Sequence, residues 1–205
     1  MISRRGVIAA VLALLVSGCS APSPVKEKAK ESENAEPVTG RFAFYQMFLS
    51  ARSWAPDAEG LRVRNIRLPK IQDTEGKSGA WEAVFVSASR RKARIFTYSA
   101  IEGEGNLHKG VFGNVEENWA GPRPQAQPWK IQAFKIDTDM AYGVANEKAK
   151  EYVKKNPDKP VSYLLEQTDR HAFLTWRVIW GESVATSNYS IYVDASTGVY
   201  VETMH

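Results

Sequence analysis

The chain has 205 residues, of which 43% are hydrophobic, so it can build a packed core as one domain or as two small ones. Its formal net charge is +4, and it falls to +2 once a segment containing Arg4 and Arg5 is removed. That balance gives no argument for a nucleic-acid partner.

The first 18 residues have the order of an export signal. A short basic region, residues 1–5, is followed by ten apolar residues, 7–16, and then by small residues before Cys19, which is the only cysteine. Ten apolar residues are fewer than the ~20 needed to span a bilayer. Residues 1–18 are therefore predicted to be a signal peptide. Ser3-Arg4-Arg5 also fits twin-arginine export, and the route stays open beside Sec export.

Val16-Ser17-Gly18-Cys19 resembles the bacterial lipobox. The resemblance implies cleavage before Cys19, acyl chains such as palmitate on its thiol, and a lipid anchor in the cell membrane. Two or more acyl chains give stable attachment. In a Gram-negative host, Ser20 after the cysteine implies the outer membrane, facing the periplasm; the sequence does not identify the host envelope. The alternative is an ordinary signal peptide with an incidental cysteine.

Residues 19–40 are rich in Lys, Glu, Ser, Pro and Ala and poor in large apolar residues. Such a segment cannot bury enough surface to offset the entropy of ordering. A disordered tether is predicted here.

Residues 41–118 are predicted to form a first helix-on-sheet module. Apolar residues recur at helical spacing up to Pro56, at Phe44, Met47, Phe48, Ala51 and Trp54. Strands are expected at 61–68, with a bulge between Val63 and Ile66, and at 81–87 and 93–98, with a short fourth at 107–112. Residues 119–130, with two tryptophans flanking prolines, are predicted to be a connector, the alternative being a segment recognised by a proline-binding groove.

Residues 131–205 are predicted to form a second module of the same order. Asp137 is expected to cap a helix from Thr138 to about Lys155. Strands follow at 161–167, 173–181 and 189–193, and 199–202 closes the chain after a turn at 194–198. The predicted fold class is α+β, with two helix-on-antiparallel-sheet modules, each a helix followed by three to four strands.

Residues 136–202 resemble a PepSY domain, in which a helix precedes an antiparallel sheet with a tryptophan-containing strand. The most specific match is Val193-Asp194-Ala195-Ser196-Thr197-Gly198, and the first module fits only the layout. The resemblance implies an exported or membrane-anchored binding domain that could restrain a peptidase.

No catalytic residue, cofactor site or metal site is predicted. His108, His171 and His205 are scattered without ligand spacing, and His171 is expected to be solvated in a polar turn. The carboxylate pairs Asp137/Asp139 and Glu102/Glu104 are interpreted as a helix start and a loop, respectively. The tryptophans at 81, 176 and 180 are expected in the core because they share the apolar parity of their strands.

Two basic clusters remain. Arg62, Arg64 and Arg67 follow one predicted strand, and Arg90, Arg91, Lys92 and Arg94 surround a hairpin turn. The favoured interpretation is a solvated edge that discourages strand pairing, and the alternative is that they meet a protein or an anionic envelope polymer.

The leading hypothesis is a non-catalytic, lipid-anchored cell-envelope protein that binds or regulates a partner, with peptidase inhibition as one form of regulation. Two alternatives stay open: an envelope hydrolase whose site forms only on folding, and a structural lipoprotein of envelope assembly.

Overall fold

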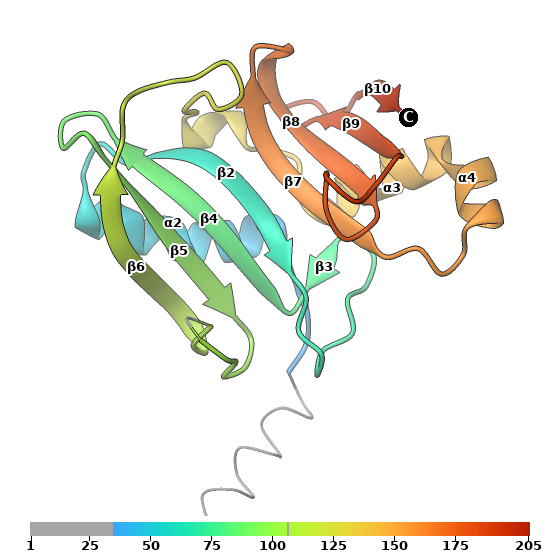
Figure 1. The fold of residues 1–205 in the computed structure, drawn as a ribbon, viewed down its shortest axis with the longest axis horizontal. Coiled ribbons are helices and arrows are strands. Elements are labelled where there is room, and N and C mark those ends of the chain that lie inside the picture. The colour runs from blue at the N-terminus through green and yellow to red at the C-terminus, as the bar shows by residue number, and fades with distance from the viewer. Residues whose placement is uncertain (1–34, 106) are drawn as a thin grey trace, which may run out of the picture.

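The computed structural model describes residues 35–105 and 107–205, which form one large sheet, a small two-stranded sheet and several helices (Figure 1). The helices are α2 (Gly40–Trp54), the 3₁₀ helix η1 (Ile131–Ala133), α3 (Thr138–Lys148) and α4 (Lys150–Lys155). The strands are β1 (Val38–Thr39), β2 (Glu59–Ile66), β3 (Lys77–Ser78), β4 (Ala80–Ser87), β5 (Lys92–Ser99), β6 (Gly110–Asn118), β7 (Val161–Thr168), β8 (His171–Trp180), β9 (Ser190–Asp194) and β10 (Tyr200–Met204).

The large sheet has eight strands in the order β10-β9-β8-β7-β2-β4-β5-β6, and every neighbouring pair is antiparallel. The prediction of two helix-on-sheet modules is therefore wrong, because strands from both halves of the sequence share one continuous sheet. Strand parity identified the elements, but nothing local in the sequence shows that two strands about 100 residues apart pair edge to edge.

That long-range pairing joins β2 to β7 at the middle of the sheet. The register sets Val63 opposite Leu165, with Arg62 opposite Glu166 and Arg64 opposite Leu164. Val63 and Leu165 are both fully buried on the helix side of the sheet. One apolar contact thus continues the core across the junction.

The helices cover one face of the sheet and share a single core. In Figure 1, α2 lies behind β4 and β5, and α3 lies behind β8 and β9. The buried side of α2, with Phe44 and Met47, belongs to the same apolar cluster as Trp81, Trp176 and the alanines of α3. The prediction that Trp81, Trp176 and Trp180 lie in the core is confirmed, since each is at most 2% exposed.

The two helix starts meet above the β2–β7 junction. The carboxylate of Asp137 accepts hydrogen bonds from the Thr39 hydroxyl at 2.7 Å, the Arg41 amide at 2.9 Å and the Thr138 amide at 2.7 Å. Asp137 is thus the N-cap of α3 and also accepts from the first turn of α2, whose own N-cap is Thr39, and helix dipoles favour negative charge at both places. Glycine is needed at position 40, because a Cβ there would lie only 3.0 Å from the rings of both Trp81 and Trp176.

Several predicted boundaries move. The predicted helix from Thr138 to Lys155 breaks at Ala149 into α3 and α4. The bulge in β2 lies between Gly60 and Arg62, before the predicted place. The predicted tether overlaps the described residues at 35–40, where β1 pairs with β3. The rest of the tether and the signal peptide lie outside the described residues.

The connector crosses from β6 to β7 and is fixed to the sheet. Trp129 is 2% exposed, and its backbone exchanges hydrogen bonds of 2.8 and 3.0 Å with Gly60 in β2. At the other end, the Trp119 amide donates to the Arg91 carbonyl at 3.0 Å.

Among the helices of the described residues, none is long and apolar enough to cross a bilayer.

Because one core spans the junction, Leu165→Ala should destabilise the whole sheet in one step. Loss of this buried side chain should lower the free energy of unfolding by about 2–5 kcal/mol. Urea unfolding followed by tryptophan fluorescence and by circular dichroism should give coincident transitions. The matched control is Leu164→Ala, on the partly exposed side of the same strand, which should cost clearly less. Two separate transitions would contradict the single core.

Candidate functional site

The face of the large sheet opposite the helices is only partly covered, and we call it the uncovered face. Strand alternation turns to this side the residues that do not enter the helix-side core. At its centre the register brings together Arg62 and Arg64 of β2, Glu82 of β4, Glu166 of β7 and Arg177 of β8. These five residues are the charged centre of the face.

The strongest contact in the charged centre is a bidentate ion pair between Arg64 and Glu82. Arg64 donates from Nε to Glu82 Oε1 at 2.8 Å and from Nη2 to Oε2 at 2.9 Å. Arg62 Nη2 lies 4.0 Å from the same carboxylate. The two arginine side chains keep 46% and 53% of their surface exposed. Their outer surfaces therefore remain accessible to a partner.

Glu166 lies across the junction, where burial raises the pKa of its carboxyl while Arg177 and Arg62 oppose that rise. Arg177 donates to the Ser190 hydroxyl at 2.9 Å and its guanidinium carbon lies 5.2 Å from the centre of the Tyr192 ring. Ser190 is 2% exposed, so its hydroxyl is a buried acceptor that positions Arg177. The cluster offers ion pairs and an aromatic ring rather than an exposed nucleophile with a base.

Beyond the charged centre, polar side chains continue across the sheet to the edge strand β10. Glu202 pairs with Tyr192 in register and accepts two hydrogen bonds from Arg170, at 2.6 and 2.9 Å. His171 Nε2 lies 3.0 Å from the same carboxylate, and the His171 side chain is only 10% exposed. The expectation of a solvated His171 is therefore wrong, because the residue begins β8 and its ring lies beside Tyr192.

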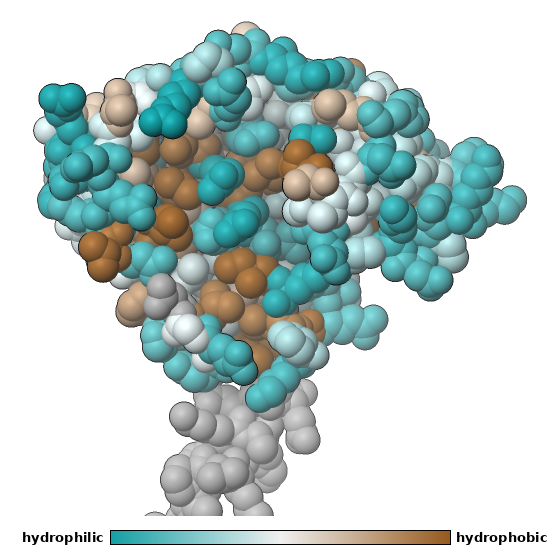
Figure 2. Space-filling model, viewed as in Figure 1, coloured by the Kyte–Doolittle hydropathy of each residue, from teal (hydrophilic) through white to brown (hydrophobic). Residues whose placement is uncertain are grey.

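Apolar side chains flank the charged centre. On the uncovered face Val84 pairs with Ile95, Val86 with Ala93, and Phe112 with Thr97. Figure 2 shows hydrophobic residues on the β4–β5 side of this face, with hydrophilic residues beside them towards the middle of the sheet. Val84, Val86 and Tyr192 are themselves buried, at 9%, 1% and 6% exposed, so the accessible apolar residues are Ala93, Ile95 and Phe112. An apolar area beside partly exposed arginines has the composition found in protein–protein interfaces.

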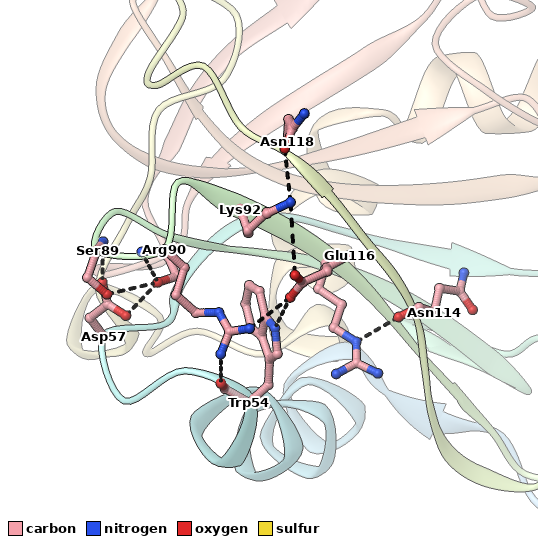
Figure 3. Close-up of polar contacts among 10 residues, drawn as sticks. Trp54, Asp57, Ser89, Arg90, Lys92, Asn114, Glu116 and Asn118 are labelled. Atoms are coloured by element: carbon pink, nitrogen blue, oxygen red, sulfur yellow. Dashed lines mark hydrogen bonds and ion pairs between the residues drawn. The ribbon is translucent and has the colours of Figure 1, made fainter.

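The predicted basic cluster at the β4–β5 turn is largely held by internal contacts (Figure 3). Arg90 donates to the Trp54 carbonyl and to Glu116, both at 3.0 Å, and Lys92 donates to Asn118 at 2.9 Å.

Arg94, on the strand beyond that turn, is held by the backbone of β6. Its Nε donates to the Asn114 carbonyl at 2.6 Å, and its guanidinium carbon lies 5.1 Å from the centre of the Phe96 ring. Arg91 is exposed at the tip of the turn, with a φ of 53°. These contacts attach the turn to α2 and β6.

The other basic cluster has a different place from the expected one. The interpretation of Arg62, Arg64 and Arg67 as an edge strand is wrong, because β2 is an inner strand between β4 and β7. Arg62 and Arg64 belong to the charged centre. Arg67 instead donates to the Val161 carbonyl at 2.8 Å and lies 3.5 Å from Asp73.

The remaining candidate residues divide into three groups. Cys19 lies outside the described residues. Asp137 caps helices as predicted, and Glu102 lies in a loop with His108 Nδ1 at 2.8 Å from its carboxylate. Within 35–105 and 107–205, no three His, Cys, Asp or Glu side chains gather to hold a metal ion.

A cavity of about 650 Å³ opens between the β2–β3 loop and the segment before β7. Its polar lining serves the loop itself: Asp73 accepts from Ser78 at 2.7 Å, and the Tyr163 hydroxyl accepts from the Gly76 amide at 2.9 Å. Burial raises the pKa of both groups. The tyrosine is therefore protonated near neutral pH and is not a ready base.

Neither a family model, nor a curated protein, nor a solved structure matches this chain. The sequence did not predict the grouping of Glu82, Glu166, Arg177 and Tyr192. Each lies on the outward parity of its strand, which was readable, whereas the β2–β7 pairing that unites them was not.

The turn that carries Arg90 makes one pH-dependent contribution to stability. Asp57 accepts from the Ser87 hydroxyl at 2.7 Å and the Ser89 amide at 2.9 Å, and these bonds lower its pKa from 3.8 to about 2. A depressed carboxyl pKa stabilises the folded state above pH 3.8, and the stabilisation is lost as the pH falls towards 2.

Asp57→Asn should therefore flatten the acid side of the stability curve within that window. Thermal melts of the parent and the variant at several acidic pH values check this. Asp158→Asn, at an exposed site, is the control and should keep the parental slope. A parental slope in Asp57→Asn would contradict the assignment.

Proposed function

We propose that this chain is a non-catalytic, lipid-anchored protein of the bacterial cell envelope that binds a protein partner through the uncovered face. The observation that carries the proposal is the charged centre beside an apolar area on a sheet face that the helices leave open. Arginine, here Arg62 and Arg64 at 46% and 53% exposed, is enriched among the residues that dominate binding energy at interfaces.

The organisation of the charged centre supports binding over chemistry. Arg64 and Glu82 hold each other in a two-bonded pair, and Arg177 is fixed between Ser190 and Tyr192. Side chains held in this way lose little conformational freedom when a partner docks. A preorganised surface of both charge signs favours one complementary partner over others.

The anchor half of the proposal comes from the lipobox resemblance at residues 16–19. The PepSY resemblance of residues 136–202 makes an envelope peptidase the first partner class to test. An attached binding surface would reach partners at or near the same membrane.

Cys19→Ala tests the anchor. It should abolish incorporation of labelled fatty acid and loosen attachment to the membrane fraction, because the thiol that carries the acyl chain is removed. Metabolic labelling followed by membrane fractionation measures both. Ser20→Ala is the matched control and should keep the label. Unchanged labelling of Cys19→Ala would sink the lipoprotein assignment.

A photoreactive amino acid at Ile95, on the apolar side of the uncovered face, tests the binding surface. It should crosslink in cells to a discrete protein. Adding Arg62→Glu should reduce that product about tenfold, which corresponds to about 1.4 kcal/mol, the cost expected if Arg62 is one of the few residues that dominate the binding energy. Lys154→Glu, exposed on α4, is the control for charge reversal and should leave the product unchanged. Equal crosslinking in the two variants would refute the role of the charged centre.

A further inference from the structure

The outward side of α2 carries an exposed apolar stripe. Phe42, Tyr45 and Leu49 are 48%, 40% and 65% exposed. Their spacing of three and four residues places them on one side of the helix, opposite the buried Phe44 and Met47. The helix therefore packs one apolar side against the sheet and, within residues 35–105 and 107–205, leaves a second apolar side exposed.

The charge of α2 narrows what could cover that stripe. The segment Gly40–Trp54 contains two arginines and no acidic residue. The guanidinium carbon of Arg41 lies 5.4 Å from the centre of the Tyr45 ring, and that of Arg52 lies 5.9 Å from the Phe48 ring. The apolar stripe is thus bordered by cations near both ends of the helix, which complements an anionic surface.

The position of α2, close to Cys19 in the sequence, points to a membrane as that anionic surface. Fifteen residues, 20–34, separate Cys19 from the first described residue, and they can span at most about 50 Å. With the proposed acyl anchor in a bilayer, α2 is the first described helix after the anchor.

We infer that the outward side of α2 docks on a bilayer surface with anionic lipid headgroups. Phe42, Tyr45 and Leu49 enter the boundary between headgroups and acyl chains, where aromatic and apolar side chains are favoured. Arg41 and Arg52 extend towards lipid phosphates. The inference rests on the proposed lipid anchor and adds a second, reversible contact to it.

This docking fixes the orientation of the folded domain. Because α2 covers the face of the sheet opposite the uncovered face (Figure 1), contact of α2 with the bilayer turns the uncovered face away from it. The surface proposed for partner binding would then remain free.

A fluorescent probe on Leu49→Cys tests the contact. In the acylated chain the native cysteine is blocked, so the introduced thiol takes the label alone. The full acylated protein is reconstituted on phosphatidylcholine vesicles containing about one third phosphatidylglycerol. Flotation reports the anchor, whereas blue-shifted emission and quenching by a nitroxide on lipid headgroups report the position of α2. Val184→Cys, on an exposed valine between β8 and β9, is the matched control.

The Leu49 probe should be quenched several-fold more than the Val184 probe, and Arg52→Glu should reduce the difference. Flotation with equal quenching at the two sites would leave the anchor standing and overturn the inference. Failure to float would overturn the anchor and the inference with it. A blue shift that grows with protein concentration without vesicles would identify a second copy as the occupant, which also refutes lipid docking.

Discussion

The pairing of β2 with β7 is the constraint on which the rest of the structure depends. Three register pairs connect the halves of the sequence, and the same three pairs act on both faces of the sheet. On one face Val63 meets Leu165 inside the core. On the other face Arg62 and Glu166 become neighbours, which creates the charged centre from strands that the sequence separates by about 100 residues.

The helix layer depends on the same junction. Asp137 caps α3 and accepts from Thr39 and Arg41 at the start of α2, so the two helices begin next to each other. Cross-linking two helix ends through a single carboxylate satisfies several otherwise unpaired donors and fixes the helices relative to each other. The helix layer behind the uncovered face is therefore connected at its centre, which limits relative movement of the helices and helps keep that face rigid.

Local physical signals in the sequence predicted most elements but not their assembly. Apolar spacing located α2, parity located the buried tryptophans, and the side chain of Asp194 forms the expected turn by accepting from the Ser196 and Thr197 amides. The single sheet was missed because strand parity shows which side is buried, not which strand lies alongside. His171 was misplaced for the same reason: its partner Glu202 comes from another strand.

The close contact between Gly60 and Trp129 restricts which side chains two positions distant in the sequence can carry. A Cβ on residue 60 would lie 2.5 Å from the indole ring, so the indole in this position requires glycine at position 60. Any relative that gains a side chain at position 60 must replace the indole by something smaller. A side chain at position 60 should therefore occur only together with a smaller residue at position 129, whereas glycine at 60 places no such limit on 129.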